Sequence, residues 1–129
     1  MSMIKGKNKG GFQELASQLA LPVKIKTATA TLLKSETGSL IVVRGTGAVT
    51  LTLPAIDKGL WYFILNAVDQ DLIIAAPTAD TLITFNDVAA DSVDFDQAGN
   101  KIGAAALIAC DGTSWIAVNI GTHTMGVNT

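Results

Sequence analysis

The chain has 129 residues, of which 49% are hydrophobic and 16% are charged, and its formal net charge at pH 7 is -2. This length and composition predict one globular domain with a core of its own and exclude a chain that is disordered throughout. No apolar run approaches the roughly 20 residues of a membrane-spanning helix. We therefore expect a soluble protein that has no membrane partner and is made in a cytoplasm.

Charge is distributed unevenly along the chain. Residues 1–34 contain six lysines and one glutamate, a net charge of +5, whereas residues 35–129 contain three basic and ten acidic residues, a net charge of -7. A basic leader therefore precedes an acidic body.

Residues 1–22 are predicted to form a basic flexible arm followed by a short amphipathic helix. Residues 1–11 mix lysine with glycine and offer little to bury. One helical stripe follows, formed by Phe12, Leu15, Ala16 and Leu19. Pro22 ends the helical pattern. So short a helix is unstable alone in water and needs a surface, which is either its own domain or a neighbouring subunit.

Residues 23–129 are predicted to form a β-rich body. Val49, Leu51 and Leu53 alternate with threonines, which is typical of a strand with one buried face. Turn signals separate candidate strands at 23–33, 39–45, 48–53, 60–66, 71–76, 81–86, 92–95, 103–110 and 114–120. This pattern predicts an all-β fold: an antiparallel β-sandwich, a jelly roll or a small barrel of about eight to nine short strands.

Several of these strands are apolar on both faces. Residues 60–65, 71–76 and 103–109 lack the polar alternate positions of a sheet with one wet face. Either the sandwich is deep, or other subunits cover a second surface. The pattern favours an oligomer.

The candidates for chemistry are sparse. His123 has no partner in the sequence that marks it as a general base, and the serines lie in no GxSxG setting. Cys110 is the only cysteine and lies in the apolar run AALIAC, which predicts a buried thiol and excludes an intrachain disulfide. We expect no enzyme activity and no cofactor.

Two glycine- or lysine-rich stretches invite a phosphate-binding interpretation. Gly45–Gly47 follows a strand, but no helix follows it, so these glycines predict a hairpin turn. Lys5, Lys7 and Lys9 have no arginine or interleaved aromatic residue beside them, and the acidic body would repel phosphate. We expect no nucleic-acid partner.

The acidic segment 86–100 contains Asp87, Asp91, Asp94 and Asp96, which could supply oxygen ligands to calcium. Their spacing does not match a calcium loop with a terminal bidentate glutamate. A solvated acidic loop is favoured, and calcium binding stays the alternative.

The order of these signals resembles a module of tailed bacteriophages that is found in capsid decoration (cement or head-fibre) proteins and in tail-fibre appendages. The resemblance covers residues 27–122. Its most recognisable positions are Leu53-Pro54, Gly59, Tyr62, Asp80-Thr81, Asp111-Gly112 and Trp115.

The resemblance implies a β-rich virion protein on the capsid surface. Such a body assembles as a homotrimer, binds the major capsid protein at three-fold or quasi-three-fold positions, and carries no catalytic residues. The hypothesised trimer interface is Leu60, Tyr62, Ile64, Ala105 and Leu107. Residues 1–22 have no counterpart in the module, so their role in capsid attachment rests on charge and amphipathicity. The hypothesised attachment residues are Lys5, Lys7, Lys9, Phe12, Leu15 and Leu19.

The alternative is a module of a phage fibre or spike that binds a receptor or a host-surface glycan. Such a tip presents exposed aromatic side chains for sugar stacking. Trp61, Tyr62, Phe63 and Trp115 all lie within strand patterns and are expected to be buried. This expectation favours the decoration protein.

Overall fold

The computed structural model describes residues 21–129, which form twelve strands in two sheets. The strands are β1 (Val23–Lys26), β2 (Ala30–Thr31), β3 (Ser39–Val43), β4 (Val49–Thr52), β5 (Trp61–Asn66), β6 (Leu72–Ala75), β7 (Leu82–Thr84), β8 (Asp87–Ala90), β9 (Ser92–Phe95), β10 (Ala105–Cys110), β11 (Trp115–Asn119) and β12 (Gly126–Asn128). A 3-10 turn, η2 (Lys34–Glu36), precedes β3. The predicted arm and helix lie almost wholly outside the described residues.

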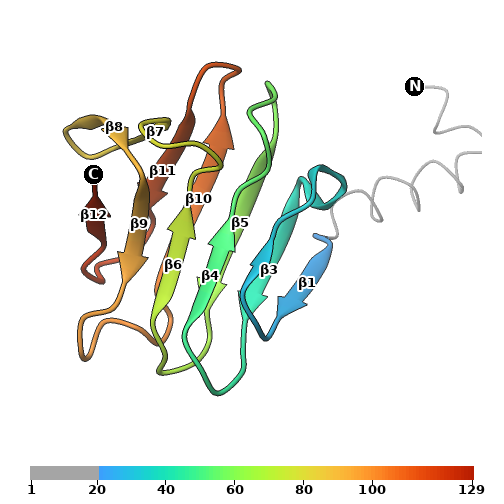
Figure 1. The fold of residues 1–129 in the computed structure, drawn as a ribbon. Coiled ribbons are helices and arrows are strands. Elements are labelled where there is room, and N and C mark those ends of the chain that lie inside the picture. Colours follow the sequence, from blue (N-terminus) through green and yellow to red (C-terminus); the bar gives the residue numbers. More distant parts are fainter. Residues whose placement is uncertain (1–20) are drawn as a thin grey trace, which may run out of the picture.

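The two sheets pack face to face as a sandwich (Figure 1). The seven-stranded sheet has the order β1-β3-β5-β10-β11-β7-β8, and the five-stranded sheet has the order β12-β9-β6-β4-β2. The all-β sandwich predicted from strand periodicity is confirmed.

Both sheets are mixed, whereas the sequence pattern predicted antiparallel ones. From β1 to β6 the chain alternates between the two sheets, and β1, β3 and β5 pair in parallel, as do β2, β4 and β6. Parallel neighbours need a crossover connection. Here each crossover is a strand of the opposite sheet, so the chain from β1 to β6 winds back and forth between the two sheets in a helical path. Antiparallel pairs such as β5–β10 and β10–β11 complete the fold.

The connection at Gly45–Gly47 is therefore not a hairpin turn, which corrects the prediction. It joins β3 in one sheet to β4 in the other. Gly45 has φ +122°, and a Cβ there would lie 2.7 Å from the backbone oxygen of Thr27. The close passage of two connections requires a glycine at this position.

The core lies between the sheets and is almost wholly aliphatic, with Tyr62, Phe95 and Trp115 as its large aromatic side chains. The rings of Tyr62 and Trp115 are 6.1 Å apart between centroids. The indole Nε1 of Trp115 donates a hydrogen bond to the Pro54 carbonyl oxygen at 3.0 Å, which satisfies its one buried donor.

The alternation predicted for residues 49–53 is confirmed, since Val49, Leu51 and Leu53 are all buried. Two strands were not predicted. They are β8 and β12, which are short and each carry one polar residue at one end, Asp87 in β8 and Asn128 in β12. The long strand predicted over 23–33 is instead two strands and a connection.

Candidate functional site

The most unusual surface is the side of the seven-stranded sheet that faces away from the core. Side chains alternate between the two faces of a strand, so the residues between the core positions point outward. One row of paired residues crosses five neighbouring strands. It consists of Val23, Leu40, Phe63, Leu107 and Val118.

Two further rows run beside the first. One consists of Ile25, Val42, Leu65 and Ala105, and Ile120 donates its backbone N–H to Ala105 at the end of this row. The other consists of Trp61, Ala109, Ile116 and Ile83. We call these three rows, with Ile120, the outer apolar face.

The outer apolar face has no charged or hydroxyl-bearing side chain in its rows. Five of its side chains are exposed to solvent: Val23, Ile25, Trp61, Val118 and Ile120. An antiparallel or mixed sheet with a wet face shows polar residues at such positions. A contiguous apolar surface of this kind is typical of a protein–protein contact.

The hypothesised interface residues are divided between the core and this face. Leu60, Tyr62 and Ile64 are buried in the core between the two sheets. Ala105 and Leu107 belong to the outer apolar face.

The outward positions of β5 are Trp61, Phe63 and Leu65. Trp61 is 38% exposed, so the expectation that it is buried was wrong, whereas burial of Tyr62 and Trp115 is confirmed. Periodicity does not single out these three positions, because residues 60–65 are apolar without interruption.

The hypothesised attachment residues Lys5, Lys7, Lys9, Phe12, Leu15 and Leu19 lie outside the described residues.

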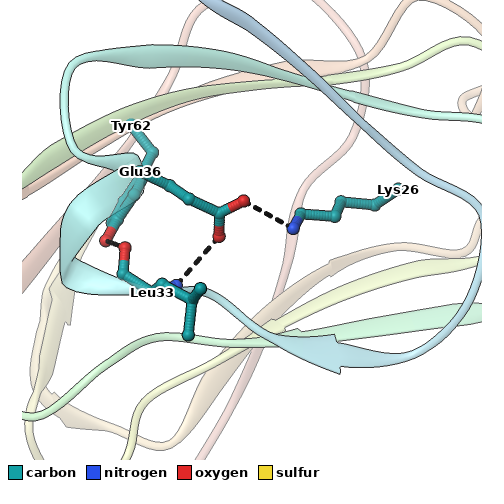
Figure 2. A network of polar contacts seen from close by, with 4 residues as sticks. All are labelled: Lys26, Leu33, Glu36 and Tyr62. Atoms are coloured by element: carbon teal, nitrogen blue, oxygen red, sulfur yellow. Dashed lines mark hydrogen bonds and ion pairs between the residues drawn. The ribbon is translucent and has the colours of Figure 1, made fainter.

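A polar network braces the edge of the sandwich beside β1 (Figure 2). Glu36 Oε2 lies 2.6 Å from Lys26 Nζ, and Glu36 Oε1 accepts the backbone N–H of Leu33 at 2.9 Å. The hydroxyl of Tyr62 donates to the Leu33 carbonyl oxygen at 2.7 Å. The network therefore ties β1, η2 and β5 together.

Two groups of this network have shifted pKa values. Burial raises the pKa of Glu36, but the hydrogen bonds from Lys26 and Leu33 outweigh burial, and the net shift is downward. Burial, with the charge of Glu36, raises the pKa of Tyr62 to about 12. At neutral pH the network thus holds a carboxylate and a neutral phenol.

The acidic segment is only partly a loop: Asp87 lies in β8 and Asp94 lies in β9, whereas Asp91 and Asp96 lie in the connections on either side of β9. Asp94 is buried, and burial raises its pKa although the Asn128 amide donates to Oδ2 at 2.7 Å. Asp91 instead accepts the backbone N–H of Asp80. Within residues 21–129, no group of three or more histidine, cysteine, aspartate or glutamate side chains is placed to hold a metal ion.

The other candidate side chains are buried or are held by contacts within the fold. His123 Nε2 donates to the Ile102 carbonyl oxygen at 2.7 Å. Burial of the Cys110 thiol is confirmed. A shallow depression of about 170 Å³ is lined by Asp69, Gly99, Lys101 and Ile102, and Lys101 is held there by an ion pair with Asp71 of 2.7 Å.

The β7–β8 hairpin presents two apolar side chains to solvent. Phe85 is 67% exposed and has φ +45°, and Val88 on the edge strand β8 is 76% exposed. A non-glycine residue in the left-handed region is strained unless its surroundings compensate.

No protein-family model, curated protein or solved structure matches this chain. Among residues 21–129, no helix is long and apolar enough to cross a membrane.

Proposed function

We propose that this chain is a non-enzymatic structural protein of a tailed-phage virion that decorates and stabilises the capsid. It acts as a homotrimer at three-fold or quasi-three-fold positions, in contact with the major capsid protein. The proposal combines the resemblance at residues 27–122 with one structural observation, the outer apolar face.

The outer apolar face supports an assembly role because it offers contact area and no chemistry. Five strands contribute its central row, from Val23 to Val118. The opposite face of the same sheet packs on the hydrophobic core. A rigid sheet that carries an uncharged surface suits a permanent contact between subunits, in which apolar area is removed from water.

The basic leader supplies a second contact in this proposal. Lysines in residues 1–22 would approach an acidic surface of the capsid, and three leaders in one trimer would add their affinities through a high effective concentration. Attachment should then weaken as salt increases.

A second candidate is a receptor- or glycan-binding module of a fibre or spike. The exposed rings of Trp61 and Phe85 favour it, since sugars stack on aromatic side chains. Trp61 lies in the outer apolar face, and Phe85 lies in the β7–β8 hairpin, so the two rings belong to different elements.

Electron microscopy of virions assembled with and without the chain tests the proposal. We expect extra density at the three-fold or quasi-three-fold positions only when the chain is present, and earlier rupture of the bare particles on heating. Density at a fibre tip, with binding to a glycan array, would replace decoration by the second candidate. If the chain is not found in purified wild-type virions, both candidate functions are refuted.

A further inference from the structure

We propose that the outer apolar face is the contact between copies of this chain, so that the two neighbouring copies in the trimer cover the rows from Val23 to Val118. This inference rests on the self-association in the proposed function and deepens it by assigning the surface.

The dimensions of the face suit such a contact. Strands lie about 4.8 Å apart and residues on one face repeat about every 6.7 Å along a strand. Five strands and three rows therefore cover roughly 24 Å by 20 Å, on the order of 500 Å² of flat sheet. Standard interfaces bury about 800 Å² of accessible surface per partner, and side chains that project from a sheet expose more area than its flat outline.

The relief of the face is also suited to another apolar sheet. Leu107 stands between Ala105 and Ala109 along β10, and Phe63 and Trp61 stand beside it on β5. Small residues next to large ones make hollows and ridges on one surface. In a closed trimer each copy contacts two others, so the ridges on one part of the face would fit the hollows on a different part of a neighbouring copy's face.

The timing of folding favours a copy over the capsid as the partner. The outer apolar face forms when the chain folds, and an open apolar face of this size is an aggregation hazard from that moment. Other copies of the same chain are available as soon as the chain is synthesised. A shell lattice becomes available only after it has assembled.

The N-terminal segment is too small to cover the face alone. The helix predicted from Phe12 to Leu19 would be about 12 Å long and 10 Å wide. It would thus cover on the order of 120 Å², about a quarter of the flat area. The charge-free rows beyond that footprint still need a partner.

The test is the double variant Phe63→Lys/Leu107→Glu. These residues face each other across β5 and β10, so opposite charges can pair within one copy and keep the sheet folded. Two charges in the middle of the face would be buried in the contact. We expect a threefold fall in molar mass by light scattering relative to the wild-type trimer, with an unchanged strand signal in circular dichroism.

The matched control is Val88→Lys, which places one charge on an exposed apolar position outside the face. It should keep the wild-type mass. Leu15→Ser/Leu19→Ser in the full chain should keep it as well. If Leu15→Ser/Leu19→Ser dissociates the oligomer and Phe63→Lys/Leu107→Glu does not, the inference is overturned and the N-terminal segment forms the contact.

Trp61 gives a readout that needs no charged variant. Its side chain is 38% exposed in one copy, so a partner sheet should shield it from acrylamide in the oligomer. We obtain its quenching as the difference between the wild type and Trp61→Phe. A Trp61 signal that stays freely quenched at concentrations where the wild type is oligomeric would overturn the inference, whatever the double variant does.

The outcomes separate the two proposals. An oligomer that survives the double variant removes the assigned surface and leaves a homotrimer with another contact. A trimer that dissociates as expected but never binds the capsid removes the decoration function and leaves the assigned surface. A wild type that is monomeric refutes this inference and the trimer together.

Discussion

Lys26 and Glu36 join the edge strand β1 to the turn η2 through an ion pair of 2.6 Å between Nζ and Oε2 (Figure 2). The Glu36 carboxylate also accepts the backbone N–H of Leu33, whose carbonyl oxygen receives the Tyr62 hydroxyl. One buried carboxylate therefore fixes the first strand of the seven-stranded sheet, which is the edge of the outer apolar face.

Glu36→Ala should destabilise the protein, because it leaves the Leu33 N–H and the Lys26 ammonium without their acceptor. Hydrogen bonds to a charged group contribute about 1.5–3 kcal/mol, and we expect a loss of about 2 kcal/mol in urea unfolding. Lys34→Ala is the control, since its ion pair with Asp57 is 3.5 Å long and exposed. The control should cost less than about 0.5 kcal/mol. Equal losses in both variants would show that the network does not brace the edge.

The Glu36 network also predicts a pH dependence. The folded-state pKa of Glu36 is lowered, so its contribution to stability is fully present above the unfolded pKa near 4.5 and is lost as pH falls through the folded value. Urea midpoints of wild type and Glu36→Gln should therefore differ at pH 7 and converge as the pH falls below 4.5 through the lowered folded-state pKa. A constant difference across this range would contradict the assignment.

Asp94 should change the pH dependence of stability in the direction opposite to Glu36. Burial raises its folded-state pKa, so the folded state favours the protonated form, and stability falls as pH rises from the ordinary value of 3.8 through the raised one. Asp94→Asn keeps an oxygen that accepts the Asn128 amide. It should raise the melting temperature at pH 7 and lose that advantage in acid.

Asp57→Asn is the comparison for Asp94, because Asp57 is exposed. It should shift the melting temperature little at either pH. A lower melting temperature of Asp94→Asn at pH 7 would show that the Asp94 charge is needed in the fold.

Gly45→Ala should cost about 2–3 kcal/mol in urea unfolding. The residue has φ +122°, and its added Cβ would meet the Thr27 backbone oxygen at 2.7 Å. Gly47→Ala, two residues on, meets nothing within 4 Å and should be neutral or slightly stabilising. Similar midpoints for the two variants would contradict the close passage of the connections.

Phe85→Gly should stabilise the isolated protein by about 1 kcal/mol, because it removes a non-glycine residue from φ +45°. Phe85→Ala is the control that removes the ring and keeps the strain. Thermal unfolding should therefore rank glycine above alanine. If the glycine variant is the less stable one, the ring contributes contacts that outweigh the strain.

The sequence was sufficient for the fold class but not for the path of the chain. Alternation in residues 49–53 identified a buried face, and turn residues separated most strands correctly. Alternation does not say which strands pair, so the parallel pairing from β1 to β6 was not predicted. The strand β12 was missed because Gly126–Asn128 is short and offers one apolar side chain.

The apolar character of both faces of β5 was predicted from the sequence, but the direction in which each side chain points was not. Every position from Leu60 to Leu65 is apolar, so periodicity gives no preference between the two faces. The choice depends on tertiary contacts: Tyr62 points inward, where its hydroxyl reaches Leu33 and its ring meets Trp115. Trp61, Phe63 and Leu65 consequently point outward.

The molar mass of the wild-type chain, measured by sedimentation equilibrium over a range of concentrations, tests the central claim most directly. If the outer apolar face holds copies together, the mass should be three times 13.4 kDa and should not fall on modest dilution. A mass of 13.4 kDa at every concentration would contradict the account.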